Sequence, residues 1–449
     1  MSNHVIAIFG GAVSGAEAAA QLSERGFQVI VFEQNALPYG KIEDGLPKWH
    51  VRLRDKEEGR INEKMMHPNV TYVPNVKLGE DVVLEDVANN WGFSAVLLAT
   101  GAWKDRPLPV EGVDEYINKG LYYQNPFIYW FNHYHEPDYD GQQYEIHDDA
   151  IVVGGGLASI DIVKALMMLS VKEKLHERGI NTNVLELDRG IVKYLEKKEI
   201  RFEDLGIKGC TLYYRRRIKD MPLSPMDKST PEKLAKAHEV QEKILNFAAS
   251  KFLFKVAPLH VPVGKIVEND RLAGLVFQET KIEDGKVKAI EGSEKEVRSP
   301  LVISSIGSLP EPIPGIPMEW NMFVIDDEKY CQVEGYDNVF ALGNAVTGRG
   351  NIKESRNHGK DISEAIIDRY LYDQQGLMEE AHRNKESVIA EEVAAIAEKL
   401  EALPAADSTK VAELYERVAM LQKGRGYTGN FEDWVRQHLP KRLEDIVGH

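Results

Sequence analysis

The chain has 449 residues, a formal net charge of −16 and 43% hydrophobic residues. This length predicts about two or three domains, each large enough to bury a core. The acidic balance argues against nucleic acid and against an anionic membrane surface, because both attract clustered Lys and Arg. We therefore expect neither kind of partner.

The chain contains two cysteines, Cys210 and Cys331. They form no CxxC pair, so a redox-active dithiol is excluded, and they are too few to hold an iron–sulfur cluster. The first residues lack the basic and apolar segments of a secretory signal, and no run is long enough to span a bilayer. We expect a cytoplasmic protein without a metal site or a membrane span.

Residues 4–33 predict a strand, a glycine turn, a helix and a second strand. The segment HVIAIF is a short buried strand, GAEAAAQLSERG contains strong helix formers and ends at Gly26, and FQVIVFE is the second strand. Two parallel strands joined in this way form a βαβ unit. Residues 69–73 and 94–101 predict two more buried strands.

The turn IFGGAVSGAEAA aligns with a GxGxxG motif at Gly10, Ala12 and Gly15, so alanine replaces the central glycine. In this motif, backbone amides and a helix N-terminus bind a pyrophosphate, and the extra methyl group narrows the approach. Glu33 ends the next strand, where a carboxylate accepts hydrogen bonds from a ribose diol. The alternative is an ordinary tight turn beside an edge-strand glutamate.

The same pattern recurs at residues 150–169, AIVVGGGLASIDIVKALMML, with Gly154 and Gly156 in the turn and Ser159 in the last position. The next recognisable strand, CTLYYRRR, ends in three arginines instead of a carboxylate. Guanidinium groups match a phosphate, so this change favours NADP(H) over NAD(H). A solvated basic strand end is the alternative.

The rest of the chain predicts fewer features. The proline-rich residues 307–317 are expected to form a crossing loop, residues 338–344 a buried strand and residues 351–371 a helix. Beyond Gln374, helical spacing of apolar residues predicts a helical hairpin broken at Pro404. We favour a packing appendage for this tail over a partner-binding role.

Together these segments resemble the adrenodoxin reductase and glutamate synthase small-subunit branch of the pyridine-nucleotide-dependent flavoproteins. The resemblance covers most of residues 4–370 and rests on LPYGKIEDGLPKWH ending at His50, NPFIYWFN with Trp130 and Asn132, GGGLASIDIVKAL with Asp161, YYRRRIKDMP, and GNAVTGRGNIKESRNHG. Glu43 departs from the arginine of adrenodoxin reductases, and Asn344 from their tryptophan. The cysteine-rich domain of glutamate synthase small subunits is absent.

The resemblance implies an α/β fold with two Rossmann-like dinucleotide-binding domains, the NADP domain being inserted into the FAD domain, followed by a C-terminal helical extension. The expected boundaries are 1–105 and 321–373 for the two parts of the FAD-binding domain, 106–320 for the NAD(P)-binding domain and 374–449 for the extension.

The resemblance also implies FAD and NADP(H) as cofactors and an oxidoreductase that transfers hydride between NADPH and FAD. Electrons would pass onward to a ferredoxin-like or iron–sulfur partner, and residues 183–219, richer in Lys and Arg than in Asp and Glu, are a conceivable docking face. Two alternatives stay open. The chain could be the flavin subunit of a larger iron–sulfur flavoenzyme complex, or a non-enzymatic nucleotide-sensing flavoprotein.

The expected site residues follow from the motifs and the resemblance. For FAD they are Gly10, Ala12, Ser14, Gly15, Glu33, Gln34, Gly40, Lys41, Thr100, Gly101, Gly343, Asn344, Gly350, Asn351 and Ile352. For NADP(H) they are Gly154, Gly156, Leu157, Ala158, Arg215 and Arg216. His50 is expected to carry a proton or to polarise the flavin edge, with a structural role as the alternative. A helix N-terminus near Asn351 is expected at the flavin N1–O2 edge.

Overall fold

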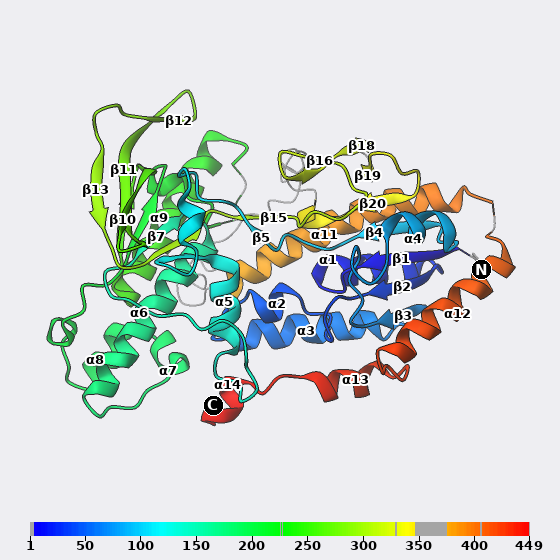
Figure 1. Cartoon of the computed structure of the whole chain (residues 1–449), viewed down its shortest axis with the longest axis horizontal. Helices are drawn as coiled ribbons and strands as arrows, with labels where there is room; N and C mark the ends of the chain where they lie inside the picture. The colour runs from blue at the N-terminus through cyan, green and yellow to red at the C-terminus, as the bar shows by residue number, and fades with distance from the viewer. Residues whose placement is uncertain are drawn as a thin grey trace.

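The structure is a computed structural model. It describes residues 4–345 and 375–448, apart from residues 225, 227, 328, 329 and 405. Side chains are described for all of these residues except 344, 375–378, 380 and 381. Two α/β units lie side by side: blue and yellow segments form most of the first, and cyan and green segments form the second (Figure 1). The helices after residue 374 lie along the first unit (Figure 1). This arrangement confirms the predicted fold class, with the second unit inserted between two parts of the first.

The first unit is built on a seven-stranded sheet in the order β18-β19-β20-β4-β1-β2-β3. Its strands are β1 (Val5–Phe9), β2 (Gln28–Phe32), β3 (Val70–Val73), β4 (Ala95–Leu98), β18 (Ile325–Asp327), β19 (Gln332–Val333) and β20 (Val339–Ala341). From β20 to β3 the pairs are parallel, whereas β18 and β19 add an antiparallel edge. The chain reverses its direction of winding between β1 and β4, so a crevice opens at the carboxyl ends of these strands.

Strand β1 lies at the centre of this sheet and is at most 2% exposed along its whole length. Ile6 and Ile8 pack on the side of α1 (Val13–Glu24), and Val5 and Phe9 pack on the side of α4 (Leu84–Asn90). Burial of each large apolar side chain contributes about 1.5–3 kcal/mol. The predicted strand, glycine turn, helix and second strand at residues 4–33 are confirmed.

Two helices of the first unit are not predicted by the sequence patterns: α2 (Lys41–Asp44) and α3 (Val51–Met65). Helix α3 buries Arg54, Glu57 and Glu58 together with three apolar residues. Because charged residues occupy part of its inner face, the apolar spacing that marks an amphipathic helix is lost.

The second unit contains a five-stranded, fully parallel sheet in the order β6-β14-β7-β8-β9. Its strands are β6 (Leu121–Tyr123), β7 (Ile151–Gly154), β8 (Thr211–Tyr214), β9 (Lys255–Pro258) and β14 (Val302–Ser305). The helices around it are α5 (Gln124–His133), α6 (Leu157–Glu177), α7 (Val184–Asp188), α8 (Ile191–Lys197) and α9 (Pro231–Phe252). The direction of winding changes between β7 and β14, which gives this unit a switch point of its own.

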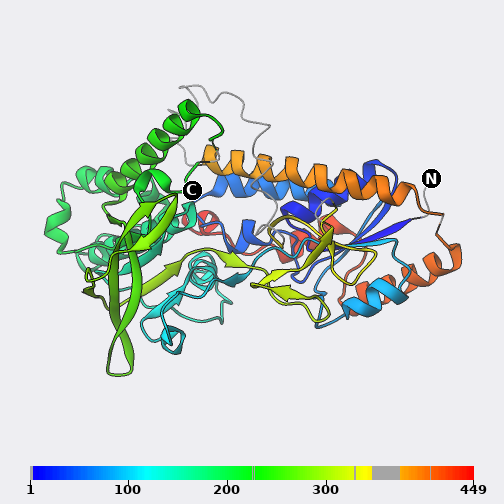
Figure 2. The same ribbon diagram turned by 90° about the horizontal axis from the view of Figure 1, so that it is seen from above.

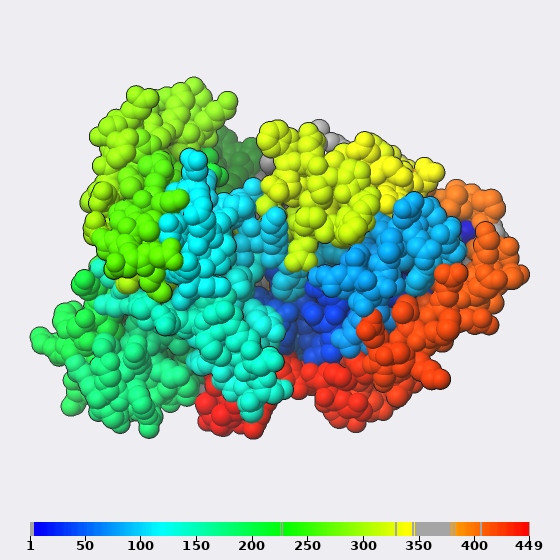
Figure 3. Space-filling model, in the orientation of Figure 1, coloured from blue at the N-terminus to red at the C-terminus, as the bar shows by residue number. Residues whose placement is uncertain are grey.

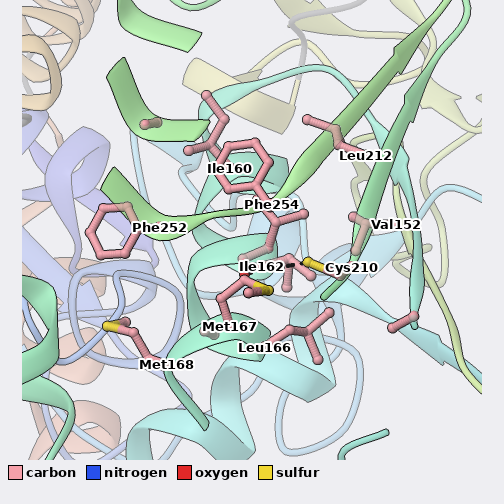
Figure 4. Packing of buried hydrophobic residues seen from close by; sticks show 14 of the residues in the cluster. Val152, Ile160, Ile162, Leu166, Met167, Met168, Cys210, Leu212, Phe252 and Phe254 are labelled. Carbon is pink, nitrogen blue, oxygen red and sulfur yellow. Dashed lines mark hydrogen bonds between the residues drawn. The ribbon is translucent and has the colours of Figure 1, made fainter. Parts of the chain in front are cut away.

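Figure 4 shows the core of the second unit, where α6 packs against β7 and β8 through Ile160, Ile162, Leu166, Val152 and Leu212. Cys210 is buried in the same cluster, and its thiol lies 3.7 Å from the carbonyl oxygen of Val163. Burial raises the pKa of the Cys210 thiol above its usual range, so this cysteine is an inert core residue.

A four-stranded antiparallel sheet covers one side of the second unit (Figure 1). It consists of β10 (His260–Glu268), β11 (Arg271–Glu283), β12 (Lys286–Ala289) and β13 (Lys295–Arg298). The sequence patterns do not predict this sheet, because much of β12 and β13 is exposed and polar.

Two strands carry the chain between the units. β5 (Lys104–Asp105) leads into the second unit, β15 (Ser308–Leu309) leads out of it, and the two pair antiparallel. The predicted crossing at residues 307–317 is therefore confirmed. It is followed by a small hairpin of β16 (Met318–Glu319) and β17 (Met322–Phe323).

The C-terminal extension forms four helices, α11 (Gln375–Glu401), α12 (Ser408–Gly424), α13 (Phe431–His438) and α14 (Leu443–Val447). The predicted break at Pro404 is confirmed, but the predicted hairpin is wrong. Ile389 and Val393 of α11 pack with α1, whereas Leu414 and Val418 of α12 pack on the opposite face of the sheet. The extension thus bridges both faces, with α11 running alongside α3 (Figure 2).

Within the described ranges, none of the helices has the length and apolar character needed to cross a bilayer. The same part of the chain holds no group of three or more His, Cys, Asp or Glu placed to bind a metal ion.

Candidate functional site

A cavity of about 730 Å³ opens at the switch point of the first sheet. This volume is typical of small-molecule sites, which measure about 300–1,000 Å³. The loop at residues 311–314 forms one rim, within the yellow surface that lies above the blue first unit in Figure 3. The expected FAD-binding residues that line the cavity are Gly10, Ala12, Ser14, Glu33, Gln34, Gly40, Lys41, Thr100, Gly101 and Gly343.

The first glycine turn allows a close approach between α1 and the strands. A Cβ atom on Gly15 would lie 1.8 Å from the carbonyl oxygen of Gly10, and Gly10 itself has a φ of 101°. Ala12 is the N-cap of α1, yet no side chain caps the helix and no acidic residue occupies its first turn. The first backbone amides of α1 therefore have no intrahelical acceptor, the arrangement that binds a phosphate.

Gly40 makes room for the methyl group of Ala12. A Cβ atom on Gly40 would lie 2.9 Å from the Cβ atom of Ala12, and both residues line the cavity. Glycine therefore occupies position 40, directly opposite Ala12, the residue that replaces the central glycine of the motif. This explains how alanine is accommodated at the centre of the motif.

Glu33 lies directly after β2 and is 3% exposed. Its carboxylate accepts hydrogen bonds from the backbone N–H of Gly11 at 2.7 Å and of Asn35 at 3.0 Å. Burial raises the pKa of Glu33 to about 7, against the lowering effect of these hydrogen bonds. An ionised carboxylate has acceptor capacity beyond these two bonds, so Glu33 can also receive the hydroxyls of a ribose diol.

Lys41 connects the cavity to the second unit. Its Nζ atom donates to Oδ1 of Asn125 in α5 at 2.9 Å and to Oγ of Ser308 in β15 at 3.2 Å. The same ammonium group lies 5.4 Å from the ring centre of Trp103, another cavity residue. Burial lowers the pKa of Lys41 to about 8, which the negative charge of Asp105 opposes. The cavity therefore reaches the junction of the two units.

The second glycine turn lies at the other switch point and confirms the second predicted βαβ start. Gly154 ends β7, and Gly156 is the N-cap of α6, again without a side-chain cap or an acidic residue in the first turn. Leu157 and Ala158 begin the helix. Its free amides repeat the phosphate-binding arrangement seen in α1.

Ser159 and Tyr214 pack around this turn. Ser159 Oγ donates to the carbonyl oxygen of Ser305 at 3.0 Å and so fastens α6 to β14. The ring of Tyr214 covers the middle glycine, because a Cβ atom on Gly155 would lie 2.2 Å from it. Tyr214 Oη also donates to the carbonyl oxygen of Asp220 at 3.0 Å, which holds the ring in place.

The three arginines after β8 differ in their partners. Arg217 donates to both carboxylate oxygens of Asp220, at 2.8 and 2.9 Å. Arg216 reaches the carbonyl oxygen of Gly285 at 3.3 Å. Arg215 is exposed and its guanidinium group has no hydrogen-bond or ion-pair partner among the described residues. Of the two expected arginines, Arg215 is therefore the one with its donors available.

His50 does not line the cavity. It precedes α3, is 3% exposed, and its Nε2 atom lies 3.7 Å from Oδ1 of Asp161 in α6. Asn132 of α5 fixes the preceding segment by accepting from the backbone N–H of Lys48 at 3.0 Å and donating to the carbonyl oxygens of Glu43 and Leu46. His50 thus sits where the two units meet.

Sequence reasoning missed the cavity residues supplied by α11, which are His382, Asn384, Lys385, Val388 and Ile389. The helical spacing of residues 388–400 predicts the helix but carries no signal for where it packs. Gly350, Asn351 and Ile352, and the helix expected at residues 351–371, lie outside the described residues, as does the side chain of Asn344.

Comparisons with known proteins agree with this geometry. The chain is 24% identical over 339 residues to the mitochondrial NADPH:adrenodoxin oxidoreductase of Arabidopsis thaliana, which covers 68% of each chain. It is 23% identical over 402 residues to NADPH-ferredoxin reductase FprA of Mycobacterium leprae, covering 81% of this chain and 84% of that one. It is also 23% identical over 375 residues to the glutamate synthase [NADPH] small chain of Bacillus subtilis, covering 82% and 67%.

Solved structures show the same fold. FprA of Mycobacterium tuberculosis in complex with NADPH superposes with a TM-score of 0.64 at 19% identity, over 94% of this chain and 90% of that one. A histidine-to-glutamine variant of the same protein gives a TM-score of 0.65 at 18% identity, with the same coverage.

Two sheets with parallel cores, each with a glycine turn and an uncapped helix at its switch point, are typical of a protein with two dinucleotide-binding units. A model of the pyridine nucleotide-disulphide oxidoreductase family matches residues 4–208. Over those residues the chain is similar to this family, and its relatives include the adrenodoxin reductase and glutamate synthase small-subunit proteins predicted from the sequence.

Proposed function

We propose that the chain is an FAD-dependent NAD(P)H oxidoreductase that transfers hydride between NADPH and FAD and passes electrons to a ferredoxin-like or iron–sulfur partner. The observation that carries this proposal is the pair of glycine turns, each opening a helix that has no side-chain cap among the described residues. Two such turns on adjacent units suit two dinucleotides that meet at the junction between them.

The cavity of the first unit fits FAD. The amides of α1 would hold the pyrophosphate, Glu33 the ribose of the adenosine half, and the residues near Lys41 and Trp103 the flavin half. Bound FAD supplies the hydride-accepting and electron-carrying chemistry, whereas the protein orients it and excludes water. We keep residues 1–105 and 321–373 as the proposed extent of this domain.

The turn at Gly154–Gly156 fits the pyrophosphate of NADPH within the proposed domain at residues 106–320. Arg215, with its donors available, would bind the 2′-phosphate. Arg216 and Arg217 lie beside it but are partly engaged by Gly285 and Asp220.

His50 is proposed to hold a proton at the junction of the units. Its Nε2 atom is buried and has no hydrogen-bond partner among the described residues, while the carboxylate of Asp161 lies 3.7 Å away.

An iron–sulfur acceptor would belong to a separate partner, because the two cysteines of the chain are too few to hold a cluster. The stretch at residues 183–219, richer in Lys and Arg than in Asp and Glu, stays the proposed docking face for an acidic partner, and its helices α7 and α8 lie on the outside of the second unit (Figure 1). We also propose a cytoplasmic location, because a low cysteine content suits a reducing compartment.

Anaerobic stopped-flow reduction of the flavin by NADPH and by NADH tests the proposal. We expect NADPH to be preferred, and Arg215→Ala to weaken NADPH binding by about 10- to 100-fold, the worth of hydrogen bonds to a charged group, while NADH is unaffected. Arg201→Ala is the control, because Arg201 is 77% exposed in the same unit and pairs with Asp204. An equal loss for both nucleotides in Arg215→Ala would contradict the assignment.

A further inference from the structure

Helix α11 of the C-terminal extension forms a wall of the cavity. His382, Asn384, Lys385, Val388 and Ile389 all line it. The Cδ1 atom of Ile389 lies 3.4 Å from the position of a Cβ atom on Gly343, so the helix packs directly on the short 3-10 turn (Gly343–Ala345) that follows β20. The extension is therefore part of the site and not only a cover for the sheet.

Charged groups and the core hold this wall in place. Glu386 of α11 accepts from Nζ of Lys64 in α3 at 2.9 Å, and the same ammonium group donates to Glu17 of α1 at 2.6 Å. Glu379 of α11 lies 2.7 Å from Nζ of Lys56. Further along α11, Val393 is completely buried against the first unit.

Lys385 differs from the other cations of the cavity wall. Lys77 pairs with Glu80 at 2.7 Å, Lys41 donates to Asn125, and His382 faces Glu57 at 3.7 Å. The ammonium group of Lys385 has no hydrogen-bond or ion-pair partner among the described residues, and desolvation at the cavity wall lowers its pKa below the ordinary value. Its positive charge is close enough to Lys41 to help lower the pKa of that residue, after burial.

The position of Lys385 relates it to the phosphate-binding turn. It precedes Ile389 by four residues, so both side chains lie on one face of α11. Ile389 packs on Gly343, and Ser14 in the first turn of α1 lies beside the same glycine. The Oγ atom of Ser14 is 2.5 Å from the position that a Cβ atom on Gly343 would take. Lys385 therefore lines the same cavity as the uncapped first turn of α1, one helical turn along α11 from Ile389.

We propose that Lys385 is a cofactor-binding residue whose ammonium group neutralises the pyrophosphate of the flavin dinucleotide, so that helix α11 is a functional wall of the flavin site. This inference rests on the proposed function. The amides of α1 supply partial charges only, and a full positive charge from a side chain complements them.

Binding of FAD to the flavin-free protein tests this role. We expect Lys385→Gln to weaken FAD binding by about tenfold or more, the worth of a charge-assisted hydrogen bond, and Lys385→Arg to stay within about threefold of the parent. Riboflavin, which lacks the pyrophosphate, is expected to bind the parent and Lys385→Gln equally. The unfolding temperature of the flavin-free protein is expected to be the same in both.

Lys423→Gln is the matched control, because Lys423 is an exposed lysine of the same extension, in α12 and outside the cavity wall. It is expected to bind FAD like the parent. FAD binding by Lys385→Gln within twofold of the parent would overturn the inference, as would an equal loss of riboflavin binding. A parent protein that binds no FAD at all would instead refute the proposed function.

Discussion

Arg442 donates a hydrogen bond from Nη1 to Oε1 of Glu43 at 2.6 Å, across 399 positions of the sequence. Glu43 lies in α2, between the cavity residues Ile42 and Gly45, and stands where the resembling adrenodoxin reductases carry an arginine. Arg442 also donates to Glu58 of α3 at 2.8 Å. The C-terminal extension thus places the guanidinium group of Arg442 against α2, a segment that lines the cavity.

Removing this guanidinium group is expected to destabilise the protein. In Arg442→Ala the side chains of Glu43 and Glu58, 14% and 11% exposed, lose a cation, and an unpaired buried charge costs about 3 kcal/mol. Denaturant unfolding measures the loss. Arg436→Ala, which removes an arginine that is 75% exposed and pairs with Asp433, is expected to cost less than about 0.5 kcal/mol. Equal losses in the two variants would refute the structural role of Arg442.

FAD affinity is expected to increase with pH through the titration of Glu33. Burial raises the pKa of Glu33 to about 7 in the flavin-free protein, whereas a ribose diol needs the ionised carboxylate as acceptor. The dissociation constant for FAD should therefore be about tenfold higher one pH unit below this pKa than at high pH. Glu33→Gln should bind FAD weakly and without this pH dependence. A parent affinity that is constant across this pH window would contradict the role of Glu33.

His133 is expected to make stability depend on pH at the junction of the units. Its ring nitrogens lie 2.7 Å from Glu136 and 3.2 Å from Asp44, and although burial lowers its pKa, these carboxylates raise it to about 9. Because the folded-state pKa exceeds the unfolded value of about 6.5, this stabilisation is complete below about pH 6.5 and is lost as pH rises through 9.

The contribution of His133 is at most about 3.5 kcal/mol, since its pKa rises from 6.5 to about 9 and each pKa unit is worth about 1.4 kcal/mol. Unfolding free energies measured across this pH range check it, with His133→Gln as the comparison. Between about pH 6.5 and pH 9, the unfolding free energy of the parent should fall more than that of His133→Gln. Parallel pH profiles for the two proteins would exclude the ion pairs as its source.

A methyl group on Gly40 is expected to disturb the flavin cavity. In Gly40→Ala the new Cβ atom would lie 2.9 Å from Ala12 Cβ. Overpacking of this kind costs about 1–3 kcal/mol, and we expect the free energy of FAD binding to weaken by this amount. Adding Ala12→Gly should restore part of the affinity by removing the facing methyl group. Gly179→Ala is the control, because Gly179 also has a positive φ, of 75°, but has no atom near its Cβ position. No recovery in the double variant would show that the clash is not the cause.

The parts predicted from sequence are those encoded locally. The buried strand before Gly10, the helix after it and the carboxylate of Glu33 lie within one short stretch, so periodicity and the motif suffice to place them. The same holds for Gly154 and α6.

The parts that were missed depend on distant contacts. The cavity wall of α11, the pairing of Arg442 with Glu43 and the accommodation of Ala12 by Gly40 join residues far apart in the chain. Likewise, three consecutive arginines look equivalent in sequence, and only the folded chain shows that Arg217 is already engaged by Asp220.

The most direct test of the two-dinucleotide account is an anaerobic titration of the purified protein with NADPH, after the bound flavin has been released from a sample and identified. The account predicts one FAD per chain and full loss of its visible absorbance with about one equivalent of NADPH, because one hydride carries the two electrons that FAD accepts. A purified chain without flavin, or an FAD that stays oxidised in excess NADPH, would contradict it.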